Sequence, residues 1–224
     1  RELAVWNHRF NLTTIVGYEQ VQVKHFLDSL TCILAFPGIT AAQQVPDAIP
    51  LLQRDCELRC ADVGSGAGFP GIPLKIIFPG MHLTLIESTH KKAVFLEHIT
   101  RLLRLDRVQV IASRAEEVGQ SPNTREQYDL VLARAVASMN VLAEYCLPLL
   151  NMGGRWIAQK GEGIEAELDA ARNALTLLGG KVAALKSYKL SLVDETRYLV
   201  AVDKVAATPR QYPRRPGVPS KKPL

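Results

Sequence analysis

Short apolar runs alternate along the chain with longer segments whose apolar residues repeat at helical spacing, beginning near residue 57. Alternation of this kind is typical of α/β proteins with a mostly parallel sheet. Only a short polar turn separates the last two runs, so we expect them to pair antiparallel at one edge of the sheet. The predicted strands are residues 58–63, 82–86, 108–111, 130–133, 155–159, 182–190 and 198–202. One predicted helix ends at residue 78, and the others cover residues 91–105, 141–150 and 164–178.

The first fifty residues lack strand-like runs. Leu3, Trp6 and Phe10 are spaced as one face of a helix, and Gln22–Leu30 forms a second helical stretch. The segment from 37 to 50, rich in Ala, Gln and Pro, is typical of a connection or a loose helix. The chain therefore divides into an N-terminal helical cap (1–50), a main α/β domain (51–204) and a basic, proline-rich tail (205–224).

The most informative stretch is residues 60–71, Cys-Ala-Asp-Val-Gly-Ser-Gly-Ala-Gly-Phe-Pro-Gly. It predicts the end of a buried strand, then a glycine-rich turn, then the start of a helix. Glycines at alternate positions, Gly64, Gly66 and Gly68, allow backbone N–H groups to approach a ligand where a Cβ would interfere. Such a turn in front of a helix indicates a nucleotide-type binding site.

Three side chains bear on which ligand this turn holds. A dinucleotide site favours G-x-G-x-x-G, but the third required position is Phe69. Asp62, at the strand end, would repel a pyrophosphate and favour a cationic ligand such as S-adenosylmethionine, which carries an ammonium and a sulfonium. Glu87 closes the second strand, where this class of fold places a ribose-binding carboxylate. The pattern favours S-adenosylmethionine over a purely structural turn.

Further polar residues follow the later strands at the same predicted edge. Glu116, or the backbone of Ala115 and Glu116, is a candidate partner for the adenine amino group, although Glu116 also suits a helix cap. Arg134 and Lys160 are candidates for orienting a base or phosphates. Arg134 is equally suited to hold the carboxylate of the cofactor or to pair with an acid. His25 and Asp28, three residues apart, either orient each other or contact a substrate.

With 224 residues, 47% of them hydrophobic and 22% charged, the composition is that of an ordinary globular chain. No apolar run approaches the ~20 residues of a membrane helix. The N-terminus lacks the layout of a secretory signal and starts at Arg1, which is compatible with loss of a short leader. The four scattered cysteines predict buried thiols in a reducing cytoplasm.

The net charge of +5 is unevenly distributed. Residues 204–224 contain six basic residues and no acid, and the rest of the chain contains 21 basic and 22 acidic residues. A basic terminus favours contact with phosphates, although a merely solubilising tail has the same composition. The candidates for RNA contact are Lys160, Arg197, Arg210, Arg214, Lys221 and Lys222.

Residues 62–74, Asp-Val-Gly-Ser-Gly-Ala-Gly-Phe-Pro-Gly-Ile-Pro-Leu, closely resemble a known bacterial family. This is the 16S rRNA guanine-N7 methyltransferase family once called glucose-inhibited division protein B (RsmG, GidB). The similarity covers nearly the whole chain, and the Gly-Phe-Pro-Gly-Ile-Pro extension is much more specific than a glycine-rich turn alone. It includes Asn11-Leu12-Thr13, residues 25–30 (His-Phe-Leu-Asp-Ser-Leu), Arg114-Ala115-Glu116, Ala133-Arg134-Ala135, Lys160-Gly161 and Tyr212-Pro213-Arg214.

The resemblance implies a class I S-adenosylmethionine-dependent methyltransferase with a Rossmann-like fold. It implies transfer of a methyl group to N7 of a guanine (position 527, in the 530 loop) of 16S rRNA, presented as RNA, small ribosomal subunit or assembly particle. A cytoplasmic monomer is expected. By resemblance, the cofactor-contacting positions are Gly64, Phe69, Ala115, Glu116 and Arg134.

Guanine N7 already presents a lone pair, so its methylation removes no proton. We therefore expect neither a catalytic general base nor a metal, only placement of N7 in line with the methyl group. The fourth strand runs into Ala133-Arg134-Ala135-Val136, without the Asn/Asp-Pro-Pro-Tyr of enzymes that methylate exocyclic amines. The alternatives are a non-catalytic RNA-binding or ribosome-assembly factor that binds S-adenosylmethionine, a small-molecule methyltransferase and an NAD-dependent oxidoreductase.

Overall fold

The computed structural model describes residues 1–37, 57–134, 137–190 and 195–224. Its centre is a seven-stranded sheet in the order β3-β2-β1-β4-β5-β7-β6, in which β7 runs antiparallel to both of its neighbours. The expected antiparallel pair at one edge is thus confirmed, with β6 outermost. The strands are β1 (Arg59–Val63), β2 (His82–Ile86), β3 (Val108–Ile111), β4 (Tyr128–Arg134), β5 (Leu150–Lys160), β6 (Gly180–Lys189) and β7 (Thr196–Lys204).

The strand order reverses between β1 and β4. From β1 the chain winds outward through β2 and β3, then returns to β4 on the other side of β1. Val63, the last residue of β1, pairs with Ile86 in β2 and with Ala133 in β4. The glycine-rich turn, Glu87 and Arg134 therefore leave the sheet at the same level. This switch point is where open α/β sheets bind their ligands.

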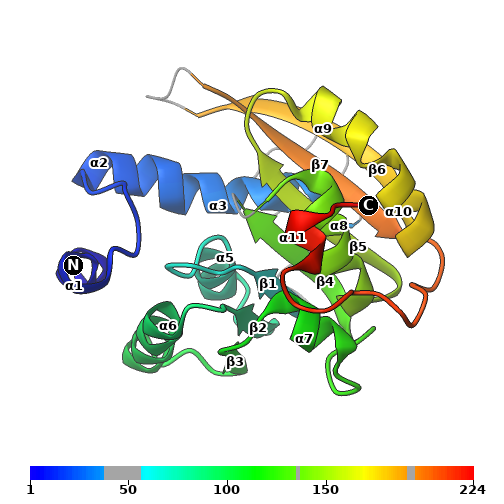
Figure 1. Ribbon diagram of the computed structural model, residues 1–224. Helices are drawn as coiled ribbons and strands as arrows, with labels where there is room; N and C mark the ends of the chain where they lie inside the picture. The colour runs from blue at the N-terminus through cyan, green and yellow to red at the C-terminus, as the bar shows by residue number, and fades with distance from the viewer. Residues whose placement is uncertain (38–56, 135–136, 191–194) are drawn as a thin grey trace.

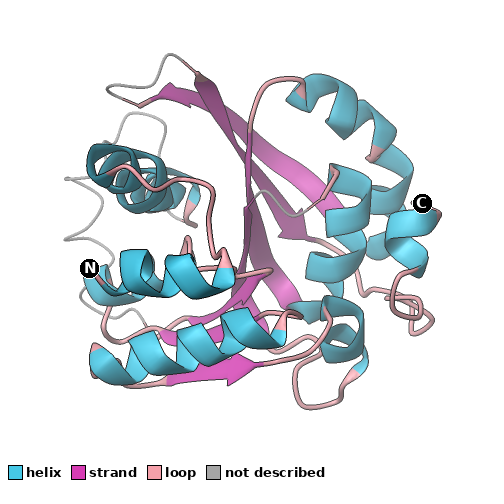
Figure 2. Ribbon diagram, turned by 60° about the vertical axis from the view of Figure 1, so that its left-hand side comes forward, coloured by secondary structure: helices cyan, strands magenta, loops and turns pink. Residues whose placement is uncertain are grey.

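Helices cover both faces of the sheet (Figures 1 and 2). One face carries α7 (Ala115–Gln120), α8 (Met139–Cys146), η3 (Leu147–Leu149), α9 (Ile164–Ala170), α10 (Arg172–Leu178) and α11 (Val218–Lys221). The other carries α1 (Glu2–Phe10), α3 (Asp28–Leu30), η2 (Thr31–Ala35), α5 (Gly71–Ile77) and α6 (His90–Leu102).

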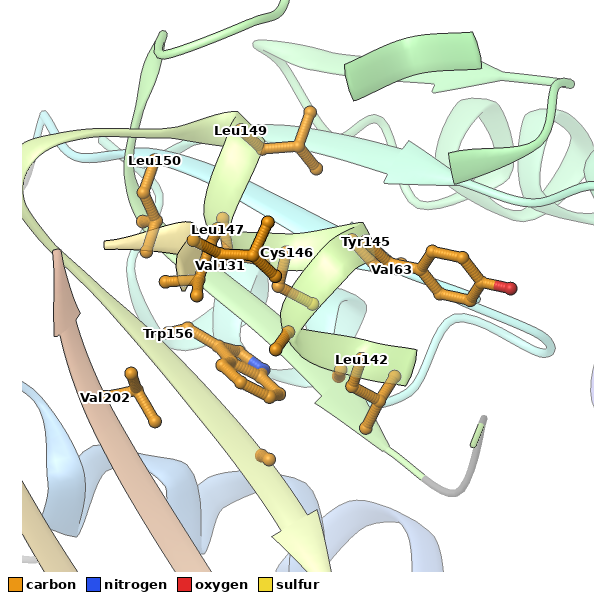
Figure 3. Packing of buried hydrophobic residues seen from close by; sticks show 14 of the residues in the cluster. Val63, Val131, Leu142, Tyr145, Cys146, Leu147, Leu149, Leu150, Trp156 and Val202 are labelled. Carbon is orange, nitrogen blue, oxygen red and sulfur yellow. The ribbon is translucent and has the colours of Figure 1, made fainter. Parts of the chain in front are cut away.

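Alternate residues along each strand supply the two cores. Val131 and Trp156 belong to the cluster under α8, whereas Leu132 and Ile157 belong to the cluster on the opposite face. Figure 3 shows the first cluster, with the fully buried Trp156 close to Val202 and Leu142. Because both faces are covered, the central strands are nearly continuous apolar runs, which is why their positions were readable in the sequence.

The N-terminal helical cap is present. Leu3, Trp6 and Phe10 of α1 pack against the second core, as their spacing predicted. The second helical stretch is longer than predicted, because α2 (Tyr18–Val21) continues through a π-helical segment, η1 (Gln22–Leu27), into α3 and η2. The predicted connection from 37 to 50 lies, except for its first residue, outside the described residues. No helix in the described ranges is long and apolar enough to cross a membrane.

The C-terminal tail, which resembles a linker in sequence, packs against the main domain beside α7 and α8 (Figure 1, red). Tyr212 is buried in the first core, and Leu224 packs against that core. Cys32, Cys60 and Cys146 are buried as expected, and Cys56 lies outside the described residues.

Candidate functional site

The glycine-rich turn begins directly after β1. Gly64, Gly66 and Gly68 have φ angles of 71°, 57° and 89°, in the left-handed region that side chains disfavour. A Cβ at Gly68 would lie 2.4 Å from Ile72, so this glycine is required for packing against the following helix. A Cβ at Gly66 would meet only the Gly64 carbonyl at 3.8 Å, so the space beside the Gly66 Cα is open and a ligand can approach the backbone there.

Asp62 lies beneath this turn and is fully buried. Its Oδ2 accepts a hydrogen bond from the Gly71 amide at 3.0 Å, while Oδ1 has no protein partner. Burial raises the pKa of Asp62 to about 7, against the opposing effects of the Gly71 amide and Arg134. An unpartnered buried acceptor of this kind favours a positively charged ligand nearby.

Glu87 follows β2 and is nearly buried. Its Oε2 accepts a hydrogen bond from the Gly66 amide at 2.9 Å, and its Oε1 accepts one from the Thr89 amide at 2.7 Å. Each carboxylate oxygen has a second lone pair, so Glu87 can hold the turn and still accept hydrogen bonds from ligand hydroxyl groups.

Two adjoining pockets open along this edge of the sheet, with volumes of about 340 Å³ and about 210 Å³. Gly64 and Ser88 line both, so an elongated ligand can pass from one to the other. The larger pocket, which we call the turn pocket, is lined by Leu12, Thr13, His25, Gly64, Ser65, Gly66, Ala67, Phe69, Glu87, Ser88, Lys92 and Arg134. The smaller, the α7 pocket, is lined by Val63, Gly64, Ile86, Ser88, Ser113, Arg114, Ala115, Glu116, Ala137, Tyr145 and Ser220.

One wall of the turn pocket joins the N-terminal cap to the sheet. The His25 and Phe69 rings stack with their centroids 4.6 Å apart, and the guanidinium of Arg134 lies 5.4 Å from the Phe69 centroid. Arg134 also donates to the Lys24 carbonyl at 3.1 Å and pairs with Asp28 Oδ2 at 3.3 Å. Arg134 therefore does pair with an acid, and this acid comes from the cap.

The hydrogen bonds of His25 fix its tautomer. Arg134 Nη2 lies 3.0 Å from His25 Nδ1, and because a guanidinium can only donate, Nδ1 accepts. The proton is then on Nε2, which donates to Thr13 Oγ1 at 2.9 Å. Burial, and next the charge of Arg134, lower the pKa of His25 to about 4. Both ring nitrogens are engaged, so His25 has no free lone pair with which to take a proton.

The α7 pocket receives a residue from the tail. Glu116 is buried at the start of α7, and its Oε1 accepts a hydrogen bond from the Gly217 amide at 2.8 Å. Ser220 lines the same pocket together with Tyr145. Burial raises the pKa of the Tyr145 phenol, which keeps it neutral. Glu116 is thus held from the tail, a contact that local sequence patterns do not reveal.

A comparison with protein families decides the class of this site. The family described as rRNA small subunit methyltransferase G (GidB) matches residues 1–197. The chain belongs to this family. Proteins named ribosomal RNA small subunit methyltransferase G are 46% identical to it in Alkaliphilus metalliredigens and 47% identical in Roseiflexus castenholzii. These matches cover 99% and 100% of this chain, and 86% and 88% of the respective relatives.

The fold has similar solved structures. One is a variant of a 16S rRNA (adenine(1408)-N(1))-methyltransferase from Catenulisporales acidiphilia with its cosubstrate SAM, at a TM-score of 0.54. The identity is 17%, with 79% of this chain and 98% of that chain covered, so this similarity shows the fold alone. Family and fold together make this protein a class I methyltransferase that uses S-adenosylmethionine. The glycine-rich turn is therefore not that of an NAD-dependent oxidoreductase.

The structure brings Gly64, Gly66, Phe69, Glu87 and Arg134 together around the turn pocket, and Ala115 and Glu116 around the α7 pocket. Gly68 lines neither pocket and packs on Ile72. Several further lining residues carry no individual signal in the sequence. Those that sequence reasoning missed are Ser88, Lys92, Ser113, Tyr145 and Ser220.

Three of the predicted RNA contacts have partners inside the protein. Lys160 donates to the Ala137 carbonyl at 2.8 Å and pairs with Glu167, while Arg197 pairs with Glu195. Arg214 pairs with the buried Glu144. Arg210, Lys221 and Lys222 are exposed, and contact between any of these six residues and RNA stays a prediction. In the described part of the chain, no group of three metal-ligating side chains comes together.

Proposed function

We propose that this protein transfers the methyl group of S-adenosylmethionine to N7 of a guanine in the 530 loop of 16S rRNA. The observation that carries the choice of N7 is the absence of an available general base among the described residues of the turn pocket. Both nitrogens of His25 are engaged in hydrogen bonds, and Glu87, held by two backbone amides, directs its remaining lone pairs to the ribose hydroxyls in this placement. A ring nitrogen with its own lone pair is the acceptor that such a pocket suits.

We place the methionine end of the cofactor in the turn pocket and its adenine ring in the α7 pocket. The chemistry of the residues fits this placement. The carboxylate of Glu87 lines the turn pocket and complements the positive charge of the cofactor, whereas Asp62 lies fully buried beneath the turn and lines neither pocket. Glu87 also suits the ribose hydroxyls. The open space beside the Gly66 Cα admits the ligand close to the backbone of the turn.

When bound, the cofactor supplies an electrophilic methyl group. The residues of this chain then act by orientation and by exclusion of water. The stacked His25 and Phe69 rings, with Arg134 beside them, form a rigid wall at which a planar base can be positioned. No residue of the chain is assigned a proton transfer. We infer that a monomer acts on rRNA, a small subunit or an assembling particle in the cytoplasm.

The test is methyl transfer from labelled S-adenosylmethionine to three acceptors, namely naked 16S rRNA, assembling particles and complete small subunits, followed by mapping of the modified base. We expect N7 methylation of one guanine in the 530 loop, with a rate at saturation that shows no fall at low pH from protonation of a catalytic base. Methylation at another atom or another base would overturn the assignment. Absence of transfer to all three acceptors, with the cofactor bound, would favour a non-catalytic assembly role.

Gly66→Ala tests whether the cofactor binds at the glycine-rich turn. Its Cβ would meet open space in the free protein, so any loss of cofactor affinity beyond backbone strain reports a clash with the ligand. Gly153→Ala is the matched variant, because Gly153 also has a left-handed φ (81°) and open space around it, yet it lies in β5 outside both pockets. We expect methyl transfer to be lost in the first variant and kept in the second.

A further inference from the structure

An ion pair with a buried carboxylate of α8 holds the tail against this helix. The carboxylate of Glu144 is fully buried, and Arg214 contacts both of its oxygens. The distances are 2.7 Å from the Arg214 amide, 2.9 Å from Nε and 2.6 Å from Nη2. A buried carboxylate without a partner is strongly unfavourable, so Glu144 requires Arg214 at this place. Arg214 is therefore fixed inside the fold, despite lying in a basic tail.

A second group of contacts fixes the backbone on the approach to Arg214. Arg125 donates to the carbonyls of Tyr212 and Thr208 at 2.7 and 2.8 Å, and Gln120 donates to the carbonyl of Pro213 at 2.6 Å. A Cβ at Gly119 would lie 2.8 Å from Pro213, so α7 leaves room for this proline. These contacts hold the tail directly against α7.

Beyond Arg214, the tail reaches the α7 pocket itself. The Gly217 amide donates to Glu116, and Ser220 lines the pocket beside Tyr145. Glu116 is therefore held on one side by the tail, which leaves its other oxygen for the pocket. The basic residues of the tail thus differ in their surroundings: Arg214 is engaged within the protein, whereas Lys221 and Lys222 are exposed.

We propose that Gly217 and Ser220 form a wall of the cofactor pocket, and that Arg214 and Glu144, which hold this part of the tail, are positioning residues that set affinity for the adenosine half of S-adenosylmethionine. This rests on the adenine placement proposed above. With the wall in place, Glu116 is oriented and the adenine ring is shielded from water. Without it, Glu116 loses its Gly217 partner and the pocket opens at Ser220, so the cofactor is bound more weakly.

The experiment measures dissociation constants by calorimetry, without RNA, for S-adenosylmethionine and for 5′-methylthioadenosine, which lacks the amino-acid end. Arg214→Ala is compared with Arg215→Ala, its exposed neighbour. We expect Arg214→Ala to weaken both ligands by a similar factor of ten or more, Arg214→Lys to restore part of the loss, and Arg215→Ala to change neither. Unchanged affinities in Arg214→Ala would overturn the proposal.

Two further variants keep the test decisive. Truncation after residue 216 leaves the Arg214–Glu144 pair intact but removes Gly217 and Ser220, and it should weaken both ligands even if Arg214→Ala does not fold. Glu116→Gln tests the adenine placement separately. If Glu116→Gln weakens 5′-methylthioadenosine but the truncation does not, the tail inference alone is wrong. If none of the variants changes affinity, the adenine placement fails as well.

Discussion

At the scale of single residues, the contact between His25 and Arg134 has a fixed direction. The guanidinium donates and His25 Nδ1 accepts, so the arrangement exists only while the imidazole is neutral. Protonation would place a second positive charge against Arg134 and remove the acceptor. The wall of the turn pocket is therefore sensitive to acid, at a residue whose environment already lowers its pKa to about 4.

We predict that this residue contributes to the pH dependence of stability. Because the folded-state pKa of His25 (about 4) lies below the ordinary value of 6.5, the unfolded state binds more protons between these pH values. The contribution is complete above pH 6.5 and declines as the pH falls towards about 4. Urea denaturation at several pH values should show a shallower decline for His25→Gln than for the wild type. Parallel curves would contradict the lowered pKa of His25 in the folded protein.

Sequence reasoning reached some of these residues and not others. Asp62 was identified because it lies at a strand end before the glycine-rich turn, and Glu87 because it closes the next strand, which is local information. The state of His25 depends on Arg134, 109 residues away. A histidine and an aspartate three residues apart suggested that His25 and Asp28 pair with each other, whereas in the structure both accept hydrogen bonds from Arg134. Such long-range partners leave no periodic signal in a single chain.

At the scale of elements, Lys160 connects the end of β5 to the segment that follows β4. Its ammonium contacts the Ala137 carbonyl and Glu167, and Glu167 also accepts from the Met139 amide at 3.0 Å. This cluster fixes the start of α8 relative to α9. The predicted single helix from 164 to 178 is in fact two helices, α9 and α10, which meet at the buried Ala171.

We predict that Lys160→Met destabilises the protein by about 1–3 kcal/mol, because Glu167 loses its partner in a partly buried place. The matched control is Arg172→Met, which breaks the ion pair with Asp169, both of whose side chains are over 70% exposed. Its effect should stay below about 1 kcal/mol. Denaturant melts of both variants measure the difference. Equal effects would mean that Lys160 is as weakly coupled to the fold as a surface lysine, and its role as an RNA contact would then be favoured.

At the scale of the whole molecule, the basic residues of the tail form two groups, one paired inside the protein and one exposed to solvent. The excess positive charge favoured contact between the tail and RNA phosphates, but composition does not distinguish an arginine that is paired inside the protein from a lysine that is exposed to solvent. Arg214 meets Glu144 across 70 residues of sequence, and Gly217 meets Glu116 across 101. The strands could be predicted because burial on both faces makes them apolar, whereas the position of the tail depends on these distant contacts.

We predict that the exposed lysines of the tail contribute to RNA affinity through phosphate contacts. Replacing Lys221 and Lys222 with Gln should flatten the dependence of log affinity on log salt by about 0.7–0.9 for each lysine that contacts a phosphate. Cofactor affinity should be unchanged. RNA binding is measured at several salt concentrations for the wild type and the variant. Parallel salt dependences would exclude this part of the tail as the RNA contact.

The position of β7 has a consequence for synthesis of the chain. β7 lies between β5 and β6, although it is the last strand to leave the ribosome. Until residues 196–204 emerge, β5 ends the growing sheet with an unpaired backbone edge, and β6 has no neighbour to join. The sheet is therefore completed only when β7 pairs with both β5 and β6. An open apolar edge invites pairing with other chains. The nascent protein is most exposed to misassembly between synthesis of β5 and arrival of β7.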